Sequence, residues 1–177
     1  METYSIRCHC KRIHAKFRCE KHRPLTVWDC NCSDCGMRRN LHFMVPARDF
    51  WLERVTTATA PTAASTDSAT ADGGTRAAAA DGTDRASTAF TPLTVEQHFE
   101  QETILYQWGT KTAIRRFCKT CGILPFYIAR SNSDGYAITY PCVDWGEDGP
   151  LPTETQRFDG VHWEESQKAT GISKETV

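Results

Sequence analysis

Cys118-Lys119-Thr120-Cys121-Gly122 lies late in the 177-residue chain and predicts a metal-binding turn. Two cysteines three positions apart can direct both sulfurs at one ion, and the glycine lets the backbone turn back behind them. The same pair could be a redox dithiol, but no βαβ pattern of a thioredoxin-like fold surrounds it. A metal at this turn would decide the fold, because it would join this turn to strands far away in the sequence.

Cys8-His9-Cys10, near the start of the chain, offers the partner pair for that turn. Residues two apart on an extended strand face the same side, so both sulfurs can meet one ion. The alternative is a pair of buried strand cysteines, but Cys118 and Cys121 would then lack partners. Cys8, Cys10, Cys118 and Cys121 together supply four thiolates, the closed set that is typical of a structural zinc.

A third group, Cys30-Asn31-Cys32-Ser33-Asp34-Cys35, is dense enough to chelate an ion by itself. It supplies three thiolates, one fewer than zinc usually takes, as in catalytic sites that keep a position for water or substrate. We interpret Cys30, Cys32 and Cys35 as this open, catalytic zinc site. A fourth protein ligand would make it a second structural zinc instead. The candidates for such a ligand are His9, Asp29, Asp34, His42 and Cys142.

The two remaining cysteines and His42 are assigned structural positions. Cys19 lies on the inward face of a predicted strand and is interpreted as a small core residue. Cys142 follows Pro141 and is also interpreted as core, with a thiol near the open site as the alternative. His42 is interpreted as a strand-surface histidine rather than a donor to the open site.

Short alternating segments separated by turn residues indicate an all-β domain. Between Tyr4 and Cys19 the alternation places Ala15, Phe17 and Cys19 inside. We expect a short helix after Trp163, and a strand or helical turn at 90–99. Further strands are expected at 25–27, 42–45, 50–52, 104–108, 113–117, 125–129 and 136–140.

Residues 56–89 consist almost entirely of Thr, Ala, Ser, Asp and Gly, with no aromatic side chain. Such a segment cannot bury enough apolar surface to offset the entropy lost on ordering. We therefore predict a disordered, low-complexity insertion within a single zinc-binding domain that spans residues 1–177. The remaining globule is small, so bound metal is expected to contribute to its stability.

The charge balance favours no macromolecular partner, since 21 Lys and Arg face 22 Asp and Glu for a net charge of -1. Neither nucleic acid nor a membrane is an expected partner. The first residues lack a signal-peptide pattern, and no apolar stretch is long enough to span a bilayer. We therefore expect a cytoplasmic or nuclear location. In such a reducing compartment, nine clustered cysteines indicate metal ligands rather than disulfides.

The three cysteine motifs together resemble the glutathione-dependent formaldehyde-activating enzyme family. The matching stretches are Cys8-His9-Cys10, Asp29 to Cys35 and Phe117 to Gly122. Further matches at 39–47, 126–127, 130–132 and 142–144 resemble the branch that includes centromere protein V. The chain departs from the family at Lys11, where a glycine is usual, and in the insertion.

This resemblance implies an Mss4-like fold of several small antiparallel sheets. It also implies a carbon–sulfur lyase that joins formaldehyde to glutathione as S-hydroxymethylglutathione. Arg38, Arg39 and Lys119 are candidates to receive the carboxylates of such a thiol. The zinc ligands that it implies are Cys8, Cys10, Cys118 and Cys121 for the structural ion, and Cys30, Cys32 and Cys35 for the second ion.

Two other functions are compatible with a zinc-bound β domain. A non-catalytic scaffold that binds protein or chromatin is the main alternative, as the resemblance to centromere protein V allows. The lack of a basic tail argues against contacts with phosphate. The other alternative is a chaperone-like nucleotide-exchange role on small GTPases. The thiolate-rich ligand set favours the lyase, because it suits activation of a sulfur nucleophile better than activation of water.

Overall fold

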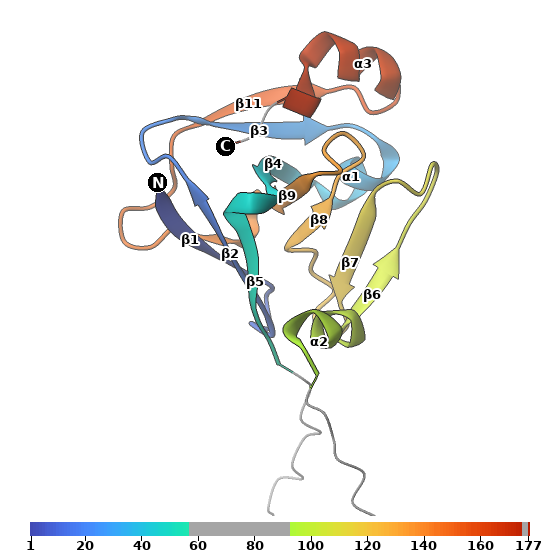
Figure 1. Ribbon diagram of the computed structural model, residues 1–177. Helices are drawn as coiled ribbons and strands as arrows, with labels where there is room; N and C mark the ends of the chain where they lie inside the picture. The colour runs from blue at the N-terminus through green and yellow to red at the C-terminus, as the bar shows by residue number, and fades with distance from the viewer. Residues whose placement is uncertain (57–92, 175–176) are drawn as a thin grey trace, which may run out of the picture.

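The computed structural model describes residues 1–56, 93–174 and 177, and is built mainly from strands (Figure 1). The all-β class expected from the sequence is confirmed. All of the predicted insertion except Thr56 lies outside the described residues. The strands are β1 (Glu2–Arg7), β2 (Ile13–Cys19), β3 (Leu25–Cys30), β4 (Leu41–Pro46), β5 (Phe50–Val55), β6 (Thr103–Tyr106), β7 (Ile114–Cys118), β8 (Phe126–Ile128), β9 (Gly135–Thr139), β10 (Val143–Asp144) and β11 (Thr153–Phe158).

The strands form two sheets rather than several. One has the order β10-β1-β2-β5, and the other has the order β11-β3-β4-β9-β8-β7-β6. Neighbouring strands are antiparallel except β3 and β11, which pair in parallel. β11 is absent from the strands expected from the sequence because five of its six side chains are exposed. Without an inward-facing row there is no alternation to detect, and backbone pairing with β3 alone defines this strand.

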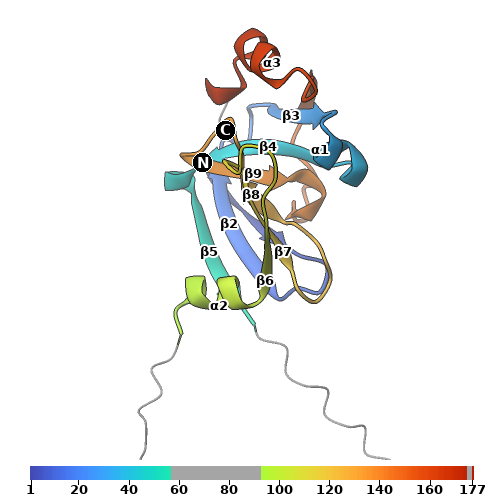
Figure 2. The same cartoon turned by 90° about the vertical axis from the view of Figure 1, so that its right-hand side faces the viewer.

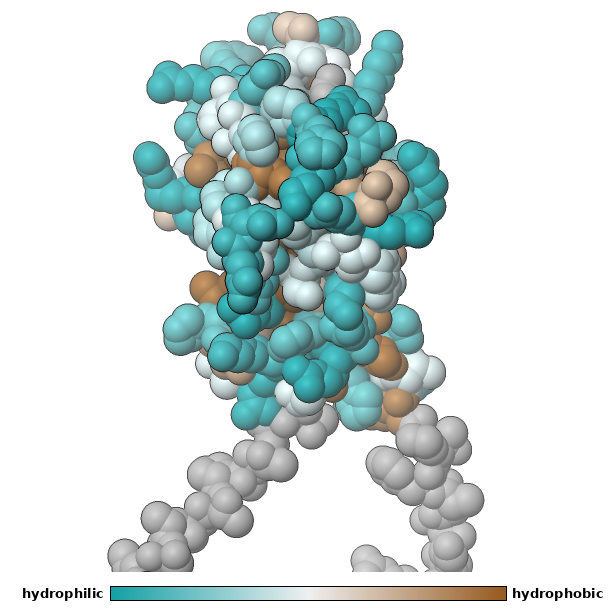
Figure 3. Space-filling model, turned by 90° about the vertical axis from the view of Figure 1, so that its left-hand side faces the viewer, coloured by the Kyte–Doolittle hydropathy of each residue, from teal (hydrophilic) through white to brown (hydrophobic). Residues whose placement is uncertain are grey.

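The main hydrophobic cluster combines residues from both sheets. Ala15, Phe17 and Cys19 are fully buried, so the inward face predicted for this segment and the core position of Cys19 are confirmed. The segment from Tyr4 to Cys19 is not one strand, however, because a turn at 8–12 divides it into the β1–β2 hairpin. Figure 3 shows a mainly hydrophilic outer face on the side of this hairpin.

The described residues also form three short α-helices: α1 (Ser33–Arg38), α2 (Val95–Gln101) and α3 (Trp163–Thr170). Thr94 and Gln97 form a capping box, which explains why the segment after residue 93 is helical rather than extended. α2 packs against β5, whereas α3 lies over β11 at the opposite end of the molecule (Figure 2). None of the helices in the described part of the chain is long and apolar enough to cross a bilayer.

Candidate metal centres

Four cysteines from distant parts of the chain converge at the first site. Their Sγ atoms all lie within 4.8 Å of one another; the four residues are Cys8, Cys10, Cys118 and Cys121. The Sγ atoms of Cys8 and Cys10 are 3.5 Å apart, and those of Cys10 and Cys118 are 3.6 Å apart. None of the nine cysteines forms a disulfide. Four soft donors in one small volume fit a metal ion such as zinc; we call this group the tetrad.

The tetrad is built from two turns. Cys8 and Cys10 lie in the β1–β2 turn and not on a strand, so the strand geometry expected for them is wrong. Lys11 takes a left-handed backbone conformation there (φ 61°), which glycine adopts at lower steric cost. Lys11 stands where glycine is usual in the family that the cysteine motifs resemble. On the other side, Gly122 is also left-handed (φ 71°) and its N–H donates to Cys118 O at 2.9 Å, closing the second turn.

The pKa values of the tetrad thiols show where protons would compete with a cation. Burial raises the pKa of the Cys8, Cys10 and Cys118 thiols. Burial acts on Cys121 in the same direction, but hydrogen bonds from the backbone amides of Cys10 and Ile123 outweigh it and lower the pKa of Cys121 to about 7. Without a cation the group therefore holds little negative charge, and a divalent ion would displace the thiol protons and stabilise the thiolates that result.

The second site consists of Cys30, Cys32 and Cys35, which we call the trio. Cys30 ends β3, Cys32 is the N-cap of α1, and Cys35 lies in its first turn; all three are buried. Their sulfurs lie within 4.8 Å of one another. Hydrogen bonds among the three thiols lower the pKa of Cys32, which also accepts from the Cys35 amide at 3.4 Å. They raise the pKa of Cys30 through its bond with Cys32, and that of Cys35 through its bonds with Cys30 and Cys32. Three close thiols with one shared charge fit a soft cation.

Within the described residues, no His, Cys, Asp or Glu donor atom joins the trio at that distance. Asp34 is held by two arginines, as described below, and His42 donates from Nδ1 to Asn40 O at 3.1 Å. Of the other candidates for a fourth ligand, His9 and Asp29 are exposed. Cys142 packs against the main hydrophobic cluster; burial raises its pKa, and the charges of Cys8 and Cys121 raise it further. It therefore lies beside the tetrad and not at the trio.

The trio lines a cavity of about 260 Å³. His42 also lines this cavity and is only 4 % exposed, so its interpretation as a strand-surface histidine is wrong. The reason is topological, because β4 lies inside the seven-stranded sheet between β3 and β9. Burial lowers the pKa of His42 to about 4, so the ring is neutral near pH 7. Its Nδ1 proton faces the Asn40 carbonyl, which leaves Nε2 as the ring atom able to accept a proton.

The arginines in the cavity wall are not the ones expected from the sequence. Arg38 is engaged with Asp34, Arg39 is exposed at the end of α1, and the Lys119 ammonium donates to the Gln101 carbonyl. Arg115 and Arg130 line the cavity instead. The sequence gives little sign of this, because both lie far from the cysteine motifs of the trio.

β7 separates the two cysteine groups. Successive side chains of a strand face opposite sides, so Arg115 and Phe117 share one face while Arg116 and Cys118 share the other. Phe117 packs against the hydrophobic cluster that contains the trio, and Cys118 belongs to the cluster shared by both sheets. The tetrad therefore anchors the end of the strand that presents Arg115 to the cavity.

Asn31 joins the trio to the segment between β11 and α3. Its Nδ2 donates to Asp159 Oδ1 at 3.0 Å, its Oδ1 accepts from Gly160 N at 2.7 Å, and its own amide donates to Phe158 O at 3.2 Å. The side chain thus holds Gly160 directly against the cysteines. A Cβ atom at Gly160 would lie 2.6 Å from Cys30 Sγ and 2.6 Å from the Cβ atom of Cys32.

Gly160→Ala is therefore expected to displace the trio. The added methyl group cannot fit without a backbone shift, so we expect a loss of about 1–3 kcal/mol in stability and about 10- to 100-fold weaker metal binding at the trio. Thermal unfolding and competition with a chromophoric chelator would measure the two effects. Gly36→Ala is the matched control, since its Cβ atom would approach no closer than 3.6 Å to Asn31 O. Unchanged metal affinity in Gly160→Ala would contradict the close packing.

No protein-family model matches the sequence. The chain is similar to a crystal structure of a Rhodobacter sphaeroides protein, a structural genomics target, with a TM-score of 0.47 and 20% sequence identity over 85% of this chain and 99% of that chain. The described residues form a small β domain with two cysteine groups that can hold metal ions.

Proposed function

We propose that this protein is a zinc-dependent carbon–sulfur lyase acting on the adduct of a small thiol, such as glutathione, with formaldehyde. One observation carries the proposal: three buried cysteine sulfurs converge in the wall of a cavity, and no fourth protein ligand joins them within the described residues. Three protein ligands around zinc are the pattern of catalytic rather than structural sites.

The donor set supports zinc at both groups. Thiolates are the soft ligands that zinc prefers, and the tetrad and the trio would each hold one ion. When bound at the trio, the ion would stabilise the thiolate form of a substrate sulfur over the thiol. The thiol proton would pass to water rather than to His42, because burial lowers the pKa of this ring to about 4. The sulfur lone pair then forms the C–S bond to the aldehyde carbon, and the carbonyl oxygen takes the charge and a proton.

The dimensions of the cavity fit the thiol end of such a substrate. At about 260 Å³ it is smaller than the pockets that usually enclose drug-sized ligands. A two- or three-carbon thiol fits inside, whereas glutathione would place its cysteinyl part at the trio and extend outward. The resemblance of the three cysteine motifs to the glutathione-dependent formaldehyde-activating enzymes supports the same reaction class.

Exchange of ¹³C-labelled formaldehyde with its glutathione adduct, followed by NMR, tests the proposal. Zinc-loaded protein is expected to accelerate the exchange over buffer, and Cys32→Ser to reduce that acceleration by about a hundredfold or more, because a metal ligand is removed. Cys142→Ala removes a thiol outside both groups and should keep the activity. No acceleration by the zinc-loaded protein, together with specific retention of a protein or chromatin partner, would favour the scaffold function instead.

A further inference from the structure

Arg115 is a buried cation in the wall of the cavity. Arg115 is only 6% exposed, and it lines the cavity together with the trio, His42 and Tyr127. The guanidinium lies over the Tyr127 ring, 5.3 Å from the centroid, and 5.9 Å from that of Trp108. These aromatic contacts fix the plane of the guanidinium and shield it from bulk water, which strengthens its electrostatic interactions.

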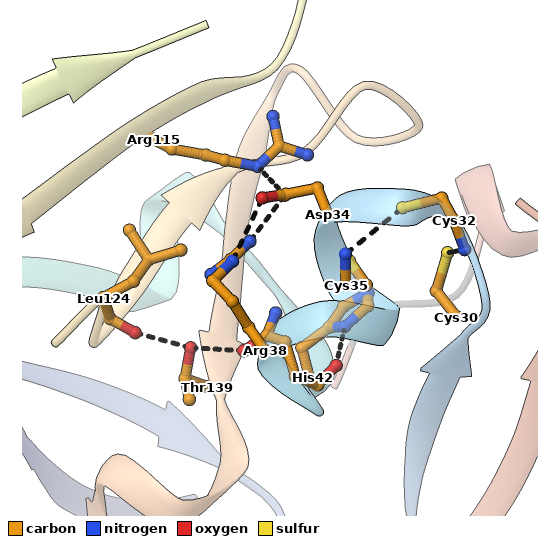
Figure 4. A network of polar contacts seen from close by, with 10 residues as sticks. Cys30, Cys32, Asp34, Cys35, Arg38, His42, Arg115, Leu124 and Thr139 are labelled. Carbon is orange, nitrogen blue, oxygen red and sulfur yellow. Dashed lines mark hydrogen bonds and ion pairs between the residues drawn. The ribbon is translucent and has the colours of Figure 1, made fainter. Parts of the chain in front are cut away.

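The nearest carboxylate is already shared with another arginine. Asp34 accepts hydrogen bonds from Arg38 Nε at 3.0 Å and from Arg38 Nη2 at 2.5 Å. Arg115 Nε lies 2.6 Å from Asp34 Oδ2, as an ion pair without hydrogen-bond geometry. In Figure 4 the dashed lines from both arginines meet at Asp34, and the outer end of the Arg115 guanidinium carries none. Among the described residues, neither Nη atom of Arg115 has a hydrogen-bond acceptor.

Cations outnumber carboxylates among these three side chains. Two arginines and one aspartate leave a net charge of about +1, before the negative charge shared by the trio in the same cavity is counted. Glu164 is the one acidic residue lining the cavity within the part of the chain described, and it pairs with Arg130 at 2.6 Å. Arg130 also stacks on Trp163 at 3.7 Å, so this pair is held at the rim. Arg115 is therefore the cation that can receive an anion from a ligand.

We propose that Arg115 binds a carboxylate of the substrate, so that the cavity selects small thiols that carry a carboxylate close to the sulfur. The sulfur would lie at the trio, a placement that rests on the proposed function, and the carboxylate would accept hydrogen bonds from the two Nη atoms. A planar guanidinium with two free donors matches the two oxygens of a carboxylate. The cavity volume restricts this recognition to a carboxylate within a few bonds of the sulfur.

Calorimetric titration of the zinc-loaded protein with three thiols of equal length tests the inference. Mercaptoacetate, 2-mercaptoethanol and cysteamine differ mainly in carrying a negative, neutral or positive group beside the thiol. Mercaptoacetate is expected to bind roughly tenfold to a hundredfold more tightly than 2-mercaptoethanol, as for a hydrogen bond between charged groups, and cysteamine most weakly. The thiol of mercaptoacetate is the least acidic of the three, so easier deprotonation cannot explain its tighter binding.

Two variants separate Arg115 from other sources of the preference. Arg115→Met should remove the difference between mercaptoacetate and 2-mercaptoethanol, whereas a preference caused by chelation of the metal would persist. Arg116→Met is the matched control, because Arg116 lies on the other face of β7 and pairs with Glu100; it should keep the preference. Arg115→Lys retains the charge near Asp34 and should show an intermediate preference, which provides a second test if Arg115→Met does not fold.

Several outcomes would overturn the inference. Equal binding of the three thiols, or no binding of any, contradicts it directly. An equal loss of affinity for all three in Arg115→Met would mean that Arg115 only offsets the charge of the metal–thiolate group. The proposed function fails separately: a clear preference for mercaptoacetate, without accelerated formaldehyde exchange for either mercaptoacetate or glutathione, would refute the lyase alone. Accelerated exchange without the preference would refute the role of Arg115 alone.

Discussion

Cys118→Ser is expected to leave the chain largely unfolded. The tetrad joins the β1–β2 turn of one sheet to the turn that follows β7 in the other, so its loss separates two parts of the core. Structural zinc in small domains contributes about 10–16 kcal/mol of apparent binding free energy, whereas a whole domain is stable by only about 5–15 kcal/mol. Circular dichroism and thermal unfolding of the purified variant would show the loss of β structure.

Cys142→Ala is the control for this experiment. It removes a partly buried thiol beside the tetrad that is not one of the four converging sulfurs. We expect it to fold and to keep its metal, with a modest decrease in melting temperature. If Cys118→Ser instead melted within a few degrees of the unsubstituted protein, the tetrad would not have the structural role that we assign to it.

Cys35→Ser should have the opposite phenotype, with the fold retained and the reaction lost. The trio comes from one short segment, so its metal closes only a small loop and adds little to the stability of distant strands. Elemental analysis should find about two zinc ions per chain in the unsubstituted protein and about one in Cys35→Ser. Formaldehyde exchange should fall by about a hundredfold or more, because the remaining two thiolates cannot hold a catalytic ion firmly.

The unsubstituted protein and the two cysteine variants need to be compared under the same metal supply. A value near one zinc per chain in the unsubstituted protein would remove the second site, and with it the proposed lyase. Equal unfolding of Cys35→Ser and Cys118→Ser would mean that both groups are structural. The contrast between the variants, rather than either result alone, tests the division into one structural and one catalytic centre.

Much of the fold follows from local patterns. Alternation predicted the inward row of β2 at Ala15, Phe17 and Cys19, because a half-buried strand must repeat every two residues. β11 could not be found in this way, since a polar strand paired through its backbone at the sheet edge has no such repeat. The turn at 8–12 was also not predicted, because the alternation of side chains in the sequence appears to run without a break from β1 to β2.

The sequence by itself determined which cysteines form the two groups. Metal ligands two or three residues apart can be read as local motifs, and the number of thiolates, four in one group and three in the other, distinguishes the two sites. Only the tertiary structure decided what faces the trio. The pairing of β7 brings Arg115 to the cavity, and His42 is buried because β4 lies inside its sheet. Gly160 lies against Cys30 because its amide donates to Asn31, which is 129 positions away in the chain. Such contacts depend on long-range strand register, which no short stretch of sequence specifies.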